Sequence, residues 1–386
     1  MTNTVYEIQV IQLDQEERMR EIQQAVAAEL REVGLHQTVS IALTEAAPTP
    51  DVPSLAVYLG SQVTATDAGV ALRIESAFNE GLVVFPVVDD LAEFSVSIPA
   101  MLASVNGWEW AGEDPARRLA RALLEELGIE DRQRRVFISH KRDDGLGAAE
   151  QLHDRLSHMG FVPFIDRFAI RSGRQVQEEI ADALEDHAFL LLLETPLAST
   201  SEWVFDEVDY ALSHTMGTLI LQWPGNPEPV PGSNGLPRVP LTKSDLVSDE
   251  HGYDTLTDAA LEAVVARIEA AHAQGLVRRR RMLIRSIEEA ASVAGCSSVP
   301  LSAWRVSVEC DTRSTILGVT PRLPTAEDLQ LLDLVRSKSS DDSSAVLVHS
   351  ARVLRERLRA HLAWAAEGRD LVVMPENAIG GQWTGL

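Results

Sequence analysis

Between residues 136 and 222, short apolar runs alternate with longer stretches in which apolar residues recur at a helical period. Such runs suit buried strands, and the stretches between them suit helices of three turns or more. Alternation of this kind builds a parallel sheet covered by helices on both faces, so we expect an α/β fold with a flavodoxin-like parallel sheet. The predicted strands are 136–139, 162–166, 188–194 and 217–222, and the predicted helices are 146–159, 174–186 and 203–213.

Similar patterns flank this region, which predicts three α/β domains in a chain of 386 residues. A charged linker at 128–135 ends the first domain. Pro and Gly crowd residues 224–240, which we interpret as a second linker without regular elements. The predicted domains are therefore 1–130, 133–225 and 241–386. The predicted strands of the flanking domains are 5–13, 38–43, 54–60, 81–88, 304–309, 315–319, 345–349 and 371–374, and their predicted helices are 15–33, 115–127, 256–291, 325–338 and 351–366.

The charge balance limits the partners that we expect. Asp and Glu number 58 against 34 Lys and Arg, for a net charge of -24. Such a field repels phosphate backbones, so we expect no nucleic acid partner. The basic run Arg278 to Arg281 is either a small-anion site or, as such runs more often are, a solvated helix face.

Cysteine content and hydropathy point to a soluble protein. The two cysteines, Cys296 and Cys310, encode neither a disulfide framework nor a thiolate metal site, which fits a reducing compartment. The first residues lack the features of a secretory signal, and no run approaches the roughly 18 apolar residues of a membrane span. We therefore expect a cytoplasmic chain with no membrane partner.

The central region carries three ordered motifs. FISHKRDD (137–144) covers the first predicted strand and its exit, VPFID and RFAIRSG (162–173) follow the next helix, and STSEWVFDEVDYAL (199–212) opens the third helix. In the last motif Trp203 and Glu207 are four residues apart, so on a helix they lie on the same side. An aromatic ring and a carboxylate placed in this way can meet one ligand.

Together these motifs resemble a Toll/interleukin-1 receptor (TIR) domain of the bacterial kind. The family shows a Phe-Ile-Ser strand end, a second strand ending in Asp, a loop closing in Gly, and a Ser-x-Trp-x-x-x-Glu helix start. His140 departs from the pattern, because the family usually has Tyr there. The resemblance implies that Glu207 is catalytic and that the remaining pocket residues bind substrate: Trp203, Phe137, Ser139, Arg142, Asp166, Arg167, Gly173 and Ser201.

In members of this family with enzymatic activity, the reaction is cleavage of NAD between nicotinamide and ribose. A carboxylate stabilises the positive charge that develops on the ribose, or holds its hydroxyls. Nicotinamide leaves as a neutral group, so we expect no metal and no cofactor, NAD being the substrate. The resemblance further implies a role in phage defence, self-association through TIR domains, and a small-molecule or protein activator; the product is ADP-ribose or a cyclic derivative.

In the first domain, residues 83–110 resemble a segment that precedes the TIR domain in some bacterial phage-defence proteins. Its α/β pattern is TIR-like, but we find no Ser-x-Trp-x-x-x-Glu equivalent. We interpret it as a degenerate, non-catalytic TIR-like domain. The third domain carries no motif that we can name, and its role stays open.

Several alternatives remain open. Taken singly, Trp203 is more often a core residue and Glu207 a solvated helix residue. TIR domains also serve as adaptors that only bind other TIR domains, and related folds place a glutamate beside a ribose in nucleotidases and glycosyltransferases. Asp143, Asp144 and Asp166 suggest a cation site only weakly. A hydrolase triad around Ser139 is weak too, because no nucleophile elbow surrounds it.

Overall fold

The computed structural model describes residues 4–37, 39–50, 52–129, 134–165, 183–184, 186–249, 252–310, 313–339, 343–350 and 354–381. The chain divides into two compact units, Met1–Asp131 and Arg132–Leu386. Within the described residues, no helix has the length and apolar character needed to cross a membrane.

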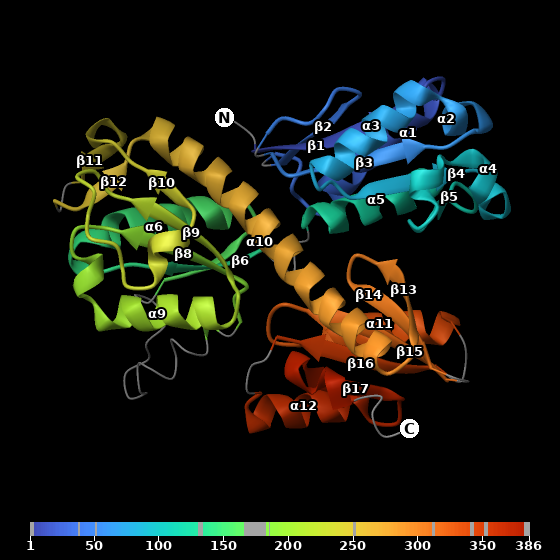
Figure 1. Cartoon of the computed structure of the whole chain (residues 1–386). Helices are drawn as coiled ribbons and strands as arrows, with labels where there is room; N and C mark the ends of the chain where they lie inside the picture. The colour runs from blue at the N-terminus through green and yellow to red at the C-terminus, as the bar shows by residue number, and fades with distance from the viewer. Residues whose placement is uncertain are drawn as a thin grey trace. The chain divides into compact units, whose positions relative to one another are not determined.

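The first unit is built on a five-stranded parallel sheet of order β2-β1-β3-β4-β5. Helix α3 packs on the sheet face that carries Ala56 and Tyr58. Helices α1 and α5 are joined by ion pairs from Arg117 and Arg121 to the buried Glu29. The elements are β1 (Thr4–Ile11), α1 (Glu16–Glu32), β2 (Val39–Thr44), β3 (Ser54–Leu59), α2 (Gln62–Thr66), α3 (Ala68–Asn79), β4 (Val84–Val88), α4 (Phe94–Ser97), β5 (Trp108–Glu109) and α5 (Pro115–Leu127), with short 3₁₀ turns at Leu91–Glu93 and Ala100–Leu102 (Figure 1).

The second unit begins with another five-stranded parallel sheet, of order β7-β6-β8-β9-β10. Numbered within its own sheet, this is the order 2-1-3-4-5, which the first unit also shows and which defines the flavodoxin-like fold. The predicted fold class is confirmed. The elements are β6 (Arg135–Ser139), α6 (Arg142–His158), β7 (Val162–Phe164), β8 (Phe189–Glu194), η4 (Ala198–Thr200), α9 (Glu202–Ser213), β9 (Gly217–Gln222), η5 (Ser233–Gly235), β10 (Arg238–Pro240), η6 (Lys243–Asp245), β11 (Leu246–Ser248) and β12 (Asp254–Leu256).

Strand residues of this sheet alternate between two cores, as the period of two in a strand requires. One face, with Leu191 and Leu193, packs against α6 and the start of α10 (Asp258–Val293). The opposite face, with Leu190 and Leu192, packs against α9. The result is a three-layer arrangement with α9 alone among these helices on its side of the sheet (Figure 1).

The interpretation of residues 224–240 as a linker without regular structure was wrong. Strand β10 lies within this segment and pairs with β9 in parallel, so the sheet extends beyond residue 225. Arg238 holds β10 in place through two hydrogen bonds, of 3.1 and 3.0 Å, to the buried Glu194 at the end of β8. A strand with a proline is tolerated here because β10 is at the edge of the sheet.

Helix α10 is shared between two cores of the second unit. Its first half contributes Val264 and Ile268 to the sheet just described, and its second half contributes Leu283 and Ile287 to a further sheet. That sheet has the order β13-β14-β15-β16-β17, with β14 antiparallel to both neighbours and β15 to β17 parallel. Its elements are β13 (Ser297–Ser302), β14 (Arg305–Cys310), β15 (Arg313–Thr320), α11 (Ala326–Ser339), β16 (Ser344–His349), α12 (Glu356–Ala366), β17 (Leu371–Pro375) and η7 (Glu376–Gly381).

The basic run on α10 is not the solvated face that such runs usually form. Arg279 is buried and binds Glu376 and Ser350. Arg280 is buried as well, with its guanidinium 5.1 Å from the centre of the Trp304 ring. Two of the four arginines therefore join α10 to the last sheet.

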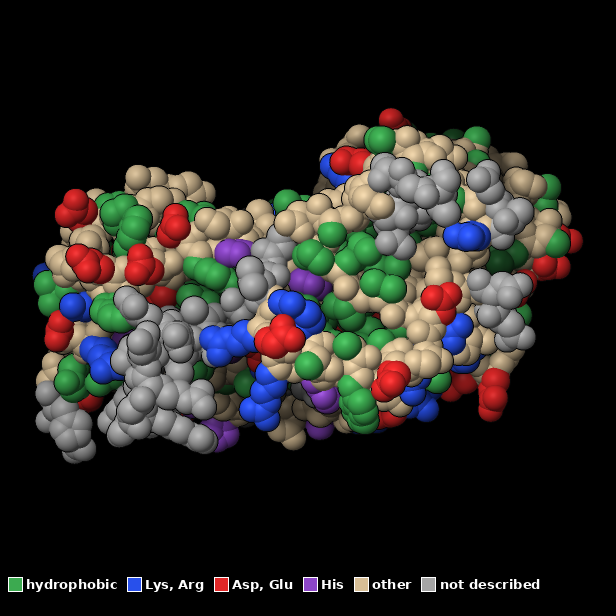
Figure 2. All heavy atoms as spheres, turned by 90° about the horizontal axis from the view of Figure 1, so that it is seen from below, with side chains coloured by type: hydrophobic (Ala, Val, Ile, Leu, Met, Phe, Trp, Pro, Cys, Tyr) green, Lys and Arg blue, Asp and Glu red, His purple; other side chains and the backbone are tan. Residues whose placement is uncertain are grey.

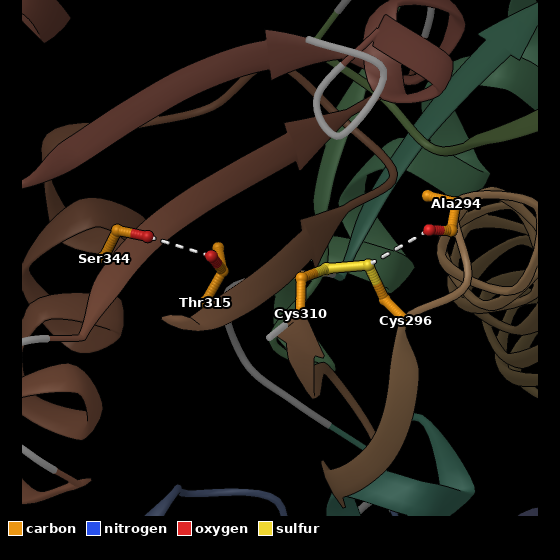
Figure 3. The surroundings of a disulfide bond; sticks show 5 residues. All are labelled: Ala294, Cys296, Cys310, Thr315 and Ser344. Carbon is orange, nitrogen blue, oxygen red and sulfur yellow. Dashed lines mark hydrogen bonds between the residues drawn. A yellow bond between two sulfur atoms is a disulfide. The ribbon is translucent and has the colours of Figure 1, made fainter. Parts of the chain in front are cut away.

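The sequence predicts no disulfide framework for the two cysteines, but the structure joins them in one disulfide bond. Cys296 immediately precedes β13 and Cys310 ends β14, and the register of this hairpin pairs Ser297 with Glu309. The two cysteines are thus opposite each other, with their Cα atoms 4.6 Å apart, and they form a disulfide bond at the end of the hairpin (Figure 3).

Charged side chains of both signs are mixed on the molecular face shown in Figure 2, with hydrophobic side chains between them. A mixed surface of this kind is typical of globular proteins.

Candidate functional site

The topology of the β6–β10 sheet indicates where a ligand would bind. The chain leaves β6 toward β7 on one side and reaches β8 on the other, so the strand order reverses between β6 and β8. Ligands of open α/β sheets bind at the carboxyl ends of the strands beside such a switch point. Ser139 and His140 lie at this end of β6, and Glu194 and Thr195 lie at the same end of β8.

Helix α9 starts from this edge, and its sequence explains its start and its orientation. Ser201 is the N-cap, and its Oγ accepts a hydrogen bond from the Val204 amide at 3.4 Å. Glu202 adds a negative charge in the first turn, which is favourable at a helix N-terminus. Val204 and Val208 then direct one side of the helix onto the sheet.

Glu207 lies on this inner side of α9, with only 5% of its surface exposed. It is therefore not the solvated helix residue that a glutamate in this position would usually be. Trp203, one turn earlier, is 44% exposed, so it is not a core residue. The pair thus combines a buried carboxylate with an indole that solvent can reach.

The remaining predicted substrate-binding residues are placed differently from one another. Phe137 is fully buried and stacks on Phe164 with 5.1 Å between ring centres, which is a packing role. Ser139 is buried at the end of β6, and its Oγ has no hydrogen-bond partner among the described residues. Arg142 is exposed at the start of α6. Asp166, Arg167 and Gly173, with most of the predicted helix 174–186, lie outside the described residues.

His187 borders this cluster of rings and has an unusual titration. Its ring lies edge-on to Phe137 with 6.1 Å between centres. Burial lowers the pKa of His187 below its usual 6.5, and the nearby Arg135 lowers it further, against the opposing effects of the Ala183 carbonyl and Asp186. The imidazole is therefore neutral at pH 7.

Sequence reasoning missed two polar contacts at the same edge of the sheet. Asp144, considered there only as a weak metal ligand, accepts hydrogen bonds from Thr195 Oγ1 and from the Leu197 amide, each of 2.8 Å. Glu194 binds Arg238, as described above. In the sequence, the feature that could have drawn attention to Glu194 is its position as a carboxylate at the end of an otherwise apolar strand. Among the described residues, no group of three or more His, Cys, Asp or Glu side chains is arranged to hold a metal ion.

Comparison with known proteins agrees with this geometry. Residues 136–257 match the sequence model of the TIR domain family. This chain carries a TIR domain. The match ends just after β12, and β12 contacts α6 through the Gln151 side chain, which makes two 2.8 Å hydrogen bonds to the Leu256 backbone.

No curated protein matches the chain in sequence. Among solved structures, the chain is similar to the tagatose-6-phosphate ketose/aldose isomerase from Escherichia coli, at 12% identity over 71% of this chain and 82% of that one. The TM-score of that superposition is 0.21, which is too low to support any conclusion.

Proposed function

We propose that the TIR domain cleaves NAD between nicotinamide and ribose, with Glu207 as the catalytic carboxylate. The observation that carries the proposal is the burial of Glu207 on the inner side of α9, beside the solvent-accessible Trp203. Burying a carboxylate is costly, so proteins keep one where it serves a purpose. A ligand bound at the carboxyl edge of the sheet would have both side chains as neighbours along α9.

The proposed reaction needs little beyond such a carboxylate. The bond between the nicotinamide nitrogen and the ribose carbon breaks, and its electron pair leaves with nicotinamide, which becomes neutral. Positive charge then develops on the ribose, where a negative side chain in a site shielded from water stabilises it. Water adds to the ribose carbon and releases one proton, giving ADP-ribose; attack by another group of the same molecule would give a cyclic product instead.

We further propose that the chain acts when its TIR domains assemble, in response to a signal of phage infection. The exposed apolar residues on and before α9, which include Leu197, Phe205 and Leu212, support association through this helix. The same residues favour the second candidate function, an adaptor that recruits other TIR domains without catalysis.

A release assay separates the two candidates. The full chain, immobilised on beads at high density to promote assembly, is incubated with NAD, and free nicotinamide is measured. We expect release by the wild type, loss of nearly all turnover in Glu207→Ala and Glu207→Gln, and normal turnover in Asp206→Ala, which removes an exposed carboxylate next to it in the sequence. Equal turnover in the wild type and both Glu207 variants would refute a catalytic role for Glu207. A chain that assembles, binds TIR partners and releases no nicotinamide would be an adaptor.

A further inference from the structure

Asp144 ties together the two strand exits that border the proposed site. It is the third residue of α6, so its position is fixed by the first turn of that helix. Its two carboxylate oxygens reach across to the connection between β8 and α9. One oxygen accepts from the hydroxyl of Thr195, which is fully buried, and the other accepts from the Leu197 amide, both at 2.8 Å.

A continuous chain of backbone hydrogen bonds leads from this anchor to α9. The Ala198 amide donates to the Thr195 carbonyl at 3.1 Å, and the Ser201 amide donates to the Ala198 carbonyl at 3.2 Å. The Phe205 amide then donates to the Ser201 carbonyl at 3.1 Å, already within the helix. Each backbone turn between Thr195 and α9 is therefore hydrogen-bonded to the turn before it, and Asp144 binds the first of these turns.

The close packing behind the loop supports the same role. Gly145 follows Asp144, and a Cβ placed on it would lie 3.5 Å from the Thr195 methyl group and 3.2 Å from His140 Cβ. Thr195 thus packs closely against the backbone of α6 while its hydroxyl is bound by Asp144. The start of the β8–α9 connection is held by contact and by charge-assisted hydrogen bonds together.

We propose that Asp144 is the residue that positions Glu207 for catalysis, by fixing the start of α9 relative to α6. The inference rests on the proposed function. Glu207 is the sixth residue of α9, about one and a half turns from its start, so a shift of the first turn moves its carboxylate with it. A displacement of about 1 Å in a reacting group can lower turnover about 100-fold. Asp144 acts through the loop and need not touch the substrate.

Four variants test this role. Asp144→Ala removes both acceptors, and Thr195→Val removes one donor while keeping the shape of the side chain. Asp144→Asn keeps an oxygen for the Leu197 amide, and its own amide can donate to the Thr195 hydroxyl. Asp143→Ala is the matched control, because Asp143 is the preceding residue, is 66% exposed, and pairs only with Lys141 among the described residues.

Two measurements are made on the full chain: nicotinamide release with kcat and KM separated, and amide hydrogen exchange of peptides that cover residues 195–208. For Asp144→Ala we expect kcat about 10- to 100-fold lower with KM changed less than about threefold, and faster exchange in these peptides. Asp144→Asn should recover most of kcat, and Asp143→Ala should match the wild type. Thr195→Val should lower kcat less than Asp144→Ala does, and combining the two substitutions should lower kcat no further than Asp144→Ala alone.

The proposal is overturned if Asp144→Ala keeps kcat within twofold of the wild type, or if exchange of residues 195–208 is unchanged. An equal loss in Asp144→Asn and Asp144→Ala, with a lower thermal midpoint in both, would indicate a general folding defect and would also overturn it. If the assembled wild type releases no nicotinamide, the proposed function fails, and the exchange measurement still decides whether Asp144 holds the loop.

Discussion

Removal of the Glu269 carboxylate should destabilise the second unit strongly. Glu269 lies on α10 and accepts hydrogen bonds of 2.7 and 2.6 Å from the guanidinium of Arg134, which directly precedes β6. Both side chains are 1% exposed. Breaking a buried ion pair by deleting one partner costs about 3 to 5 kcal/mol, because the other charge stays buried without its counter-charge. In Glu269→Ala, Arg134 loses this carboxylate while its guanidinium remains over the Phe161 ring.

The decrease in the free energy of unfolding is measured by urea titration of the full chain, with unfolding followed by hydrogen exchange of peptides from β8 and β9. These peptides report on the second unit alone, which matters because two units need not unfold together. A loss of 3 kcal/mol corresponds to an opening equilibrium raised about 100-fold or more. Folded domains have free energies of unfolding of about 5 to 15 kcal/mol, so a unit well above the lower limit would remain folded in water.

The same helix offers a matched control. Glu262 on α10 pairs with Arg155 on α6 at 2.8 Å, but these side chains are 27% and 26% exposed. We expect Glu262→Ala to cost about 1 kcal/mol or less, because solvent screens such pairs. The double variant Arg134→Met/Glu269→Leu should be more stable than Glu269→Ala, since no buried charge remains. Equal losses in Glu269→Ala and Glu262→Ala would refute the argument that burial sets the cost.

Three further predictions concern the same unit. Gly275→Ala should destabilise it by about 1 to 3 kcal/mol despite the better helix propensity of alanine, because the new Cβ would lie 2.8 Å from the Gly217 Cα; an unchanged urea midpoint would contradict this. The pKa of His187 is lower in the folded chain than the value near 6.5 in the unfolded chain. At pH values between these two, the unfolded chain binds more protons, so the free energy of unfolding should fall as the pH drops below 6.5. Urea midpoints at pH 7.5 and 5.5 should show this fall in the wild type and a smaller one in His187→Leu. Reduction of Cys296–Cys310, which closes a loop with a sequence separation of 14, should cost up to about 3 kcal/mol, seen as faster exchange in the β13 and β14 peptides; equal exchange with and without reductant would refute it.

The sequence was sufficient to predict most of the secondary structure, because hydrophobic period is a local property. The predicted helix 256–291 corresponds to α10, and the predicted strands 188–194 and 217–222 correspond to β8 and β9. What it failed to show depends on pairing between distant residues. Strand β10 was hidden because a three-residue strand that follows Pro237 and ends in Pro240 shows no period of its own. It is a strand only because it pairs with β9 and is bound to Glu194.

In the candidate site, too, features set by local spacing could be predicted from the sequence, and contacts between distant residues could not. The spacing of Trp203 and Glu207 indicated a shared side of α9, and Val204 and Val208 on the sheet-facing side account for the burial of Glu207. No local pattern could indicate that Asp144 binds Thr195, which is 51 residues away. The burial of Arg279 was equally hidden, because its partner Glu376 is 97 residues further along.

The first unit has the same strand order as the TIR domain but differs from it after the third strand. Both sheets have the order 2-1-3-4-5, and in both a serine caps the helix that follows the third strand: Ser201 before α9, and Ser61 before α2. A carboxylate occurs six residues after each cap, Glu207 in one and Asp67 in the other.

In the TIR domain the helix continues past this position, and Glu207 is buried against the sheet. In the first unit the helix ends there, and Asp67 turns to accept the Val70 amide at 2.8 Å as the N-cap of α3. The physical difference is thus one of helix length: α9 runs twelve residues and α2 only five. This supports the interpretation of the first unit as a TIR-like fold without catalysis, and it predicts that Asp67→Ala lowers the stability of that unit by about 1 kcal/mol while leaving nicotinamide release unchanged. A loss of release in that variant, with the unit still folded, would contradict the assignment of catalysis to the TIR domain alone.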